Sequence, residues 1–189
     1  MDDIAAAKAQ LRKKILSHRG QRTDFAEVEN LLSKQLLILI ERHQPERVAT
    51  YLSFGSEPGT SIFIKELIAR DIEVLVPRVT ATQELQWFSF DGFSTASSDL
   101  GMPEPDARVL PEVRLRISDV MVIPALAADQ LGNRLGRGKG YFDRELSKMM
   151  NKNIFAVCYE SEFLASIPHE EHDQRVSAVV TEAAIHELN

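Results

Sequence analysis

Two neighbouring stretches decide the fold: "SDVMVIPALA" (118–127) and "GNRLGRGKGYFDREL" (132–146). The first is a short and nearly continuous apolar run, which is typical of a strand that is buried on both faces. The second concentrates glycine and basic residues just before a helical pattern. A loop between the end of a strand and the start of a helix is the position where open α/β sheets bind ligands.

The composition of this loop favours an anionic ligand. Its bare backbone and its positive charge come from Gly136, Gly138 and Gly140, and from Arg134, Arg137 and Lys139. Glycines let the backbone approach an anion, and a helix N-terminus offers free N–H groups. Two common nucleotide-binding motifs do not fit this loop. The Walker A motif, GxxxxGK[ST], would need a glycine at the position of Asn133. The dinucleotide-binding motif, GxGxxG, does not match the spacing of the glycines in "GRGKG". The alternative is a flexible surface turn with incidental basic residues.

Size and charge limit the possible classes of protein. The chain has 189 residues and a net charge of −6, which suits one compact domain over 1–189 and disfavours a general nucleic-acid binder. The single cysteine, Cys158, excludes an internal disulfide and is expected to be buried. The start of the chain lacks a secretory signal, and the most apolar run, "LLSKQLLILI", is too short to span a bilayer. We therefore expect a cytoplasmic protein without membrane or nucleic-acid partners.

Hydrophobic periodicity predicts alternating helices and strands. A helix over 5–19 should end at Gly20, and Asp24 with Glu27 resembles a capping pair for the next helix. The apolar residues of that second helix recur at helical spacing: Phe25, Val28, Leu32, Leu36 and Leu39. Further helices are expected at 61–70 and from about 141, and strands at 47–54, 72–79, 85–90, 118–127, 154–160 and 177–182. The second of these helices should place Phe142, Leu146, Met149 and Met150 on one face.

This alternation predicts an α/β fold with a single domain of three layers, α/β/α. An open, mainly parallel sheet should carry helices on both faces, with strand 85–90 antiparallel to its neighbour. The passage 91–113 is rich in Gly, Pro and Ser and shows no periodicity, and such irregular segments are often functional. Trp87 is expected in the core, with a stacking surface as the alternative.

The glycine segment closely resembles the signature GxRLGxGxGYYDR of the 5-formyltetrahydrofolate cyclo-ligases, also called methenyltetrahydrofolate synthetases. Other segments resemble family elements in the same order: "KAQLRKKI", "YLSFGSEPGT", "LGMPEP" and "PHEEHDQRVSAVVTE". The resemblance covers essentially the whole chain. It implies an ATP- and Mg²⁺-dependent ring-forming ligase that converts 5-formyltetrahydrofolate into 5,10-methenyltetrahydrofolate with release of ADP and phosphate. It also implies a monomer.

The resemblance assigns the phosphate-binding and catalytic residues. ATP is implied to contact Lys8 and Arg12 on the first helix, with the folate as an alternative partner for Arg12. It is also implied to contact a continuous run in the loop: Arg134, Leu135, Gly136, Arg137, Gly138, Lys139, Gly140, Tyr141 and Phe142. Arg137 and Lys139 are the residues expected to meet the transferred phosphoryl group. Tyr141 is implied to lie where the nucleotide and folate sites meet. Lys8 and Arg12 are four residues apart, so they share one helix face.

The resemblance also assigns the substrate and metal residues. Leu52 and Glu57 are implied to bind the folate, since a carboxylate can accept hydrogen bonds from the N–H groups of a pterin. Asp143 and Asp173 match magnesium-associated carboxylates, although an acid early in a helix can equally interact with the helix dipole. His169 and His172 flank Asp173 without convincing metal-ligand spacing and are expected to be loop residues.

Two departures from the family pattern keep alternatives open. Phe142 replaces the second tyrosine of the signature, and Ser177 replaces an aspartate that many relatives carry four residues after the position of Asp173. A different ATP-using enzyme on the same scaffold, such as a kinase, is one alternative. A nucleotide or folate sensor without catalysis is the other.

Overall fold

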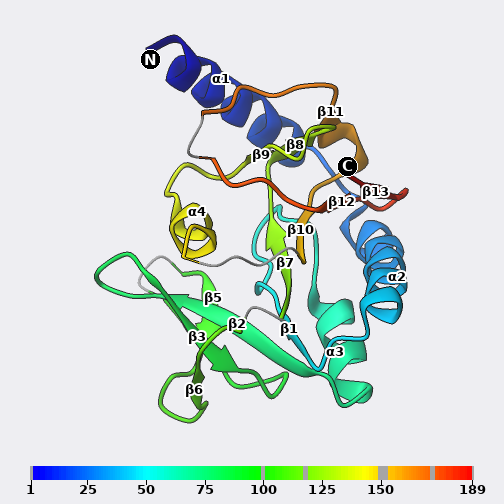
Figure 1. Ribbon diagram of the computed structural model, residues 1–189, viewed down its shortest axis with the longest axis vertical. Coiled ribbons are helices and arrows are strands. Elements are labelled where there is room, and N and C mark those ends of the chain that lie inside the picture. The colour runs from blue at the N-terminus through cyan, green and yellow to red at the C-terminus, as the bar shows by residue number, and fades with distance from the viewer. Residues whose placement is uncertain (1, 99–100, 117–118, 149–152, 171–172, 189) are drawn as a thin grey trace.

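An eight-stranded sheet forms the centre of the fold, with the order β13-β12-β10-β7-β1-β2-β3-β6 (Figure 1). The computed structural model describes residues 2–98, 101–116, 119–148, 153–170 and 173–188. The parallel strands are β1 (Arg47–Ala49), β2 (Glu73–Val79), β7 (Val120–Pro124), β10 (Ile154–Val157) and β12 (Ala178–Val180). Antiparallel pairing attaches β3 (Leu85–Ser89), β6 (Glu112–Val113) and β13 (Ile185–Glu187) at the edges. The prediction of an open, mainly parallel sheet is confirmed.

Helices cover both faces of this sheet and create two apolar layers. On one face, α2 (Phe25–His43) and α3 (Ser61–Ala69) pack against Val48, Val122 and Phe155. On the other face, α4 (Tyr141–Leu146) packs against Met121 and Ile123 through Leu146. The central strands β7 and β10 are buried over most of their length, as expected for parallel strands covered on both sides. Figure 1 shows α4 and the pair α2 and α3 on opposite sides of the sheet.

The helix α1 (Asp2–Arg19) covers a second, smaller sheet of order β11-β8-β9. This sheet contains β8 (Ala127–Asp129), β9 (Arg134–Leu135) and β11 (Phe163–Leu164), and Ile15 of α1 packs with its apolar residues. The predicted strand 118–127 therefore breaks at Ala125 and Leu126 and continues as β8. As predicted, Gly20 follows the last residue of α1.

Several local predictions were wrong. Asp24 does not cap α2, because its carboxylate accepts two hydrogen bonds from Arg22 instead. Phe25 is 36% exposed, whereas the rest of the predicted stripe is buried. The passage 91–113, expected to be irregular, contains β4 (Thr95–Ser97), β5 (Pro103–Pro105) and β6. The two prolines of β5 conceal it in the sequence, since a proline cannot donate to a strand ladder and is tolerated mainly at sheet edges.

The predicted strand 47–54 ends early, at Ala49, because side chains replace the ladder beyond it. Thr60 Oγ1 donates to the carbonyl of Tyr51 (2.7 Å) and accepts from the amide of Ser53 (3.3 Å). Tyr51 Oη donates to the carbonyl of Pro58 (2.8 Å). These bonds turn residues 50–60 into a braced loop, called here the 50–60 loop.

Other expectations about burial are settled by the fold. Trp87 is 3% exposed and Cys158 is 1% exposed, so both lie in the core. Phe142 and Leu146 pack against the same apolar layer, while Met149 and Met150 lie outside the described residues. No helix within the described ranges is both long enough and apolar enough to cross a bilayer.

Candidate functional site

The glycine loop, residues 136–140, connects β9 to α4 and needs its glycines for conformation and space. Gly138 and Gly140 have φ angles of +96° and +67°, a region that side chains strongly disfavour. A Cβ on Gly138 would come within 3.4 Å of Arg12 Cζ. The loop therefore presents its backbone directly to Arg12, which lies on α1.

The first helix contributes two cations to this region. Arg12 Nε donates to the carbonyl of Gly136 at 2.9 Å. Lys8 Nζ donates to Asp173 Oδ2 at 2.6 Å and to Glu170 Oε2 at 2.7 Å. Burial favours a lower pKa for Lys8, but its bonds with Asp173 and Glu170 outweigh this effect and raise the pKa. Helix α1 thus contacts both the glycine loop and the segment after β11, and Figure 1 shows α1 and that segment side by side.

Arg134 is the most deeply buried cation of the site. Its side chain is 2% exposed, and its Nη2 lies 2.6 Å from Asp143 Oδ1. Its Nε has no hydrogen-bond partner among the described residues. Burial lowers the pKa of Arg134, while the charges of Asp143 and Asp173 oppose that shift. A buried guanidinium with an unused donor can bind a further acceptor, such as a phosphate oxygen.

Glu57 and Arg137 join the 50–60 loop to the glycine loop. Arg137 Nε donates to Glu57 Oε1 at 2.9 Å, and the amide of Phe54 donates to Glu57 Oε2 at 3.2 Å. The Arg137 guanidinium also lies 5.3 Å from the centre of the Phe54 ring. The carboxylate expected to bind folate therefore lies within hydrogen-bonding distance of a cation expected to bind phosphate.

The remaining predicted residues differ in what they can offer a ligand. Leu135 is 1% exposed, so only its backbone can face a nucleotide, whereas Phe142 is partly buried and packs against the core. Lys139 is exposed and forms no ion pair with any residue in the described ranges. Tyr141 is half-buried at the first position of α4, with Arg144 Cζ 5.5 Å from its ring centre. Leu52 is half-buried and packs against the core.

The two predicted metal-binding acids, Asp143 and Asp173, both act on Arg134. Their charges favour its protonated form, although burial still lowers its pKa. Among the described residues, no group of three His, Cys, Asp or Glu side chains could hold a metal ion. This arrangement suits Mg²⁺ bound through a nucleotide, because Mg²⁺ commonly uses one or two carboxylates together with water and phosphate oxygens. His169 contacts the carbonyl of Ile167, as expected for a loop residue, and His172 lies outside the described residues.

Sequence reasoning missed Asp129, a fully buried acid that organises the approach to the loop. Its Oδ1 accepts hydrogen bonds from the amides of Leu131 and Asn133, both at 3.0 Å. Its Oδ2 accepts from Asn133 Nδ2 at 3.0 Å and from the amide of Ile167 at 3.1 Å. Asp129 thus ties the turn before Arg134 to the segment that leads to Glu170 and Asp173. A lone aspartate after an apolar run was the available signal.

Ser177 lies at the start of β12, where its amide donates to the carbonyl of Ile154 at 2.8 Å. Ile154 is the first residue of β10, so Ser177 is at the amino-terminal edge of the sheet. The neighbouring Val176 donates its amide to the carbonyl of Gly132 at 3.0 Å. The replacement of an aspartate by Ser177 therefore lies one residue from the contact with the turn that precedes Arg134.

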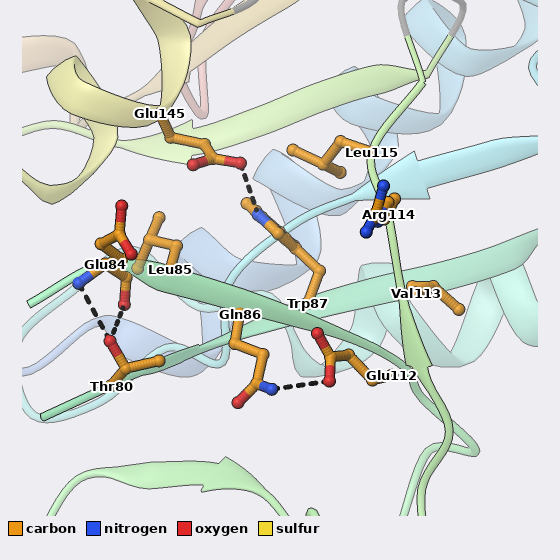
Figure 2. Close-up of a pocket in the computed structure, with 10 residues that line it drawn as sticks. All are labelled: Thr80, Glu84, Leu85, Gln86, Trp87, Glu112, Val113, Arg114, Leu115 and Glu145. Carbon is orange, nitrogen blue, oxygen red and sulfur yellow. Dashed lines mark hydrogen bonds between the residues drawn. The ribbon is translucent and has the colours of Figure 1, made fainter. Parts of the chain in front are cut away.

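A cavity of about 400 Å³ lies apart from the predicted site, between α4 and the strands β3 and β6 (Figure 2). Its lining contains Trp87, whose Nε1 donates to Glu145 Oε1 at 3.3 Å, and Gln86, which donates to Glu112 at 2.7 Å. None of the residues expected to bind ATP, folate or magnesium lines it. The lining combines several carboxylates with a buried indole, so it does not suit a triphosphate.

The fold and the site together describe an α/β fold with a mainly parallel sheet and a cationic, glycine-rich loop that runs from β9, an antiparallel edge strand of the smaller sheet, to α4. The model of the 5-formyltetrahydrofolate cyclo-ligase family matches residues 4–182, so the chain belongs to this family. This confirms the resemblance found in the motifs.

Individual relatives agree. The chain is 34% identical over 140 residues to the 5-formyltetrahydrofolate cyclo-ligase of Mycolicibacterium smegmatis, with 71% of this chain and 72% of that protein covered. It is 28% identical over 173 residues to the Haemophilus influenzae cyclo-ligase, with 88% and 92% covered. The NMR structure of Aquifex aeolicus 5,10-methenyltetrahydrofolate synthetase superposes with a TM-score of 0.83 at 25% identity, covering 96% of this chain and 93% of that one.

Proposed function

We propose that this chain converts 5-formyltetrahydrofolate and ATP into 5,10-methenyltetrahydrofolate, ADP and phosphate, with Mg²⁺. The observation that carries the proposal is a loop of bare glycine backbone flanked by cations. Arg12 donates to the carbonyl of Gly136, Lys8 lies one turn earlier on the same helix, and Arg134 precedes the loop with a buried donor that no described residue uses. These cations and amides match the charge of a triphosphate. Family membership supplies the substrate class.

The chemistry requires activation of a poor leaving group. Closing the ring expels the formyl oxygen, which leaves readily only after it has been phosphorylated. The formyl oxygen attacks the γ-phosphorus of ATP and ADP departs, giving an iminophosphate. N10 of the folate then attacks the activated carbon, and phosphate leaves with the former formyl oxygen. Such a reaction depends on positioning and charge stabilisation and needs no protein nucleophile.

Each group of residues has a role in this scheme. Arg137 and Lys139 stabilise the charge of the transferred phosphoryl group, and Tyr141 separates the nucleotide from the folate. Glu57 accepts hydrogen bonds from the pterin, for which it must exchange its partner Arg137. That exchange releases Arg137 toward the phosphates. Asp143 and Asp173 would hold Mg²⁺, which neutralises part of the triphosphate charge when bound.

The proposal is tested by mixing the protein with MgATP and 5-formyltetrahydrofolate and following the methenyl chromophore by absorbance. We expect product in a one-to-one ratio with ADP, and no product when ATP or Mg²⁺ is left out. Well-folded protein that binds both ligands and forms neither product would instead indicate a sensor. ADP formed only with a different acceptor would indicate a kinase.

A further inference from the structure

A second cavity, of about 200 Å³, lies between the 50–60 loop, the start of α3 and the β4–β5 hairpin. Its lining joins four apolar side chains with four hydroxyl-bearing ones and one cation: Leu52, Ile64, Phe90 and Pro103, then Ser53, Thr60, Ser61 and Thr95, and Lys65. Leu52 also belongs to the predicted folate-binding set. The cavity therefore shares a residue with the candidate substrate site, and none of the glycine-loop residues lines it.

Lys65 is the charged residue in this lining, and its ammonium is available. It is exposed, and it makes no hydrogen bond or ion pair with other residues in the described ranges. The adjacent Glu66 is oriented toward Arg70, at 3.9 Å. The N-terminal amides of α3 are already occupied, because Glu29 accepts hydrogen bonds from Ser61 and Ile62 at 2.7 and 3.1 Å. An anion in the cavity would therefore pair with Lys65 rather than with the helix end.

The 50–60 loop links this cavity rigidly to Glu57. The loop is cross-braced through Thr60 and Tyr51, and Glu57 is fixed to it by the amide of Phe54. One braced segment thus presents Leu52 to the cavity and Glu57 to the glycine loop. A substrate that contacts both must have an apolar or aromatic part on the Leu52 side, and an anionic end suits Lys65.

We propose that the cavity binds the benzoylglutamate arm of the folate and that Lys65 pairs with a carboxylate of its glutamate. The arm is an aromatic amide that ends in carboxylates, which matches the apolar side chains of the lining beside a free ammonium. This inference rests on the proposed function and deepens it. Lys65 is then a specificity-determining residue for folates that carry an intact glutamate.

The test compares Lys65→Met, which keeps most of the aliphatic stem, with the wild type, Lys65→Arg and the control Lys34→Met. Lys34 is an exposed lysine on α2, so the control removes the same charge elsewhere. The ligands are 5-formyltetrahydrofolate and its analogue with both glutamate carboxylates converted to amides. Affinity is measured by calorimetry and KM by the methenyl assay, because binding can then be scored separately from turnover.

We expect Lys65→Met to weaken binding of the folate by about three- to tenfold, and the diamide to bind the wild type more weakly by a similar factor. Lys65→Met should bind the two ligands equally, Lys65→Arg should restore the preference, and Lys34→Met should behave as the wild type. The inference would be overturned if Lys65→Met still bound the folate more tightly than the diamide by the same factor as the wild type. Binding with this pattern but without turnover would overturn the proposed function alone, and failure of the wild type to bind the folate would overturn both.

Discussion

At the scale of the residue, the side chains expected to bind phosphate are paired with those expected to bind metal or folate. Lys8 pairs with Asp173, Arg134 with Asp143, and Arg137 with Glu57. Because each pair neutralises its own charge, ligand binding must exchange partners. Removing one partner of a buried pair also leaves the other charge uncompensated, which destabilises the fold.

Lys139 and Arg12 are exceptions among the described residues. Arg12 donates to a backbone carbonyl, whereas Lys139 is exposed and lacks an ion-pair partner in the described ranges. Lys139→Ala should therefore raise the KM for ATP by about tenfold or more while changing the free energy of unfolding by less than about 0.5 kcal/mol. Steady-state kinetics and urea unfolding measure the two effects, with Lys34→Ala as the matched control. Turnover equal to that of the wild type would contradict the phosphate role of Lys139.

Tyr159 provides a residue-scale prediction for pH. Burial raises its pKa to about 12, against an effect of Arg19 and Arg22 in the opposite direction. Because the folded pKa lies above the unfolded value of about 10, the stabilising contribution is complete below pH ~10 and is lost as the pH rises toward 12. In Tyr159→Phe, the decline of unfolding free energy over this range should become shallower by up to about 1.4 kcal/mol per pH unit. Urea unfolding in alkaline buffers measures the slope, and an unchanged slope would refute this assignment.

At the scale of the element, two buried polar groups hold the site together. Arg19, at the end of α1, forms two hydrogen bonds with Glu162 and one with the carbonyl of Ala125, all at 2.7 Å. This contact fixes the helix that carries Lys8 and Arg12. Asp129 fixes the turn before Arg134 to the segment that carries Asp173. The proposed phosphate site thus depends on buried contacts of residues that are not themselves expected to bind a ligand.

Asp129→Asn tests the second of these contacts selectively. An amide oxygen can still accept from the backbone amides of Leu131 and Asn133. The NH₂ group then faces both the N–H of Ile167 and Asn133 Nδ2, and it cannot accept either bond. We expect the free energy of unfolding to fall by about 1–3 kcal/mol and the KM for ATP to rise by about three- to tenfold.

The control for Asp129→Asn is Asp119→Asn, which disturbs a different buried carboxylate. Asp119 accepts two hydrogen bonds from Arg47 at the opposite edge of the sheet. This variant should lose stability without a change in the KM for ATP. A similar rise in KM for both variants would show that the effect of Asp129 is only a loss of stability.

At the scale of the whole molecule, residues that are far apart in the sequence meet at the candidate site. Arg12 is 124 residues away from its partner Gly136 in sequence. Arg12→Ala should raise the KM for ATP by about tenfold, because a charge and a hydrogen bond to the glycine loop are both lost. Lys14→Ala, on an exposed position of the same helix, should leave KM unchanged. Equal KM values for the two variants would place α1 outside the nucleotide site.

The sequence predicted the layers of the fold because the apolar runs of β7 and β10 and the stripe of α2 are strong local signals. The β4–β5 hairpin was missed because Pro103 and Pro105 hide its pattern. The candidate residues came from motifs, but their pairing could not be predicted. Whether Arg137 meets Glu57 depends on how two loops 80 residues apart pack together, and local patterns do not encode that.

The transfer of the formyl oxygen is the most direct test of the account. The protein is given 5-formyltetrahydrofolate with ¹⁸O in the formyl group, MgATP and ordinary water, and the released phosphate is analysed by mass spectrometry. We predict one ¹⁸O atom in each phosphate, with one methenyl product and one ADP formed for each label transferred. Methenyl product accompanied by unlabelled phosphate would contradict the central claim that the site phosphorylates the formyl oxygen.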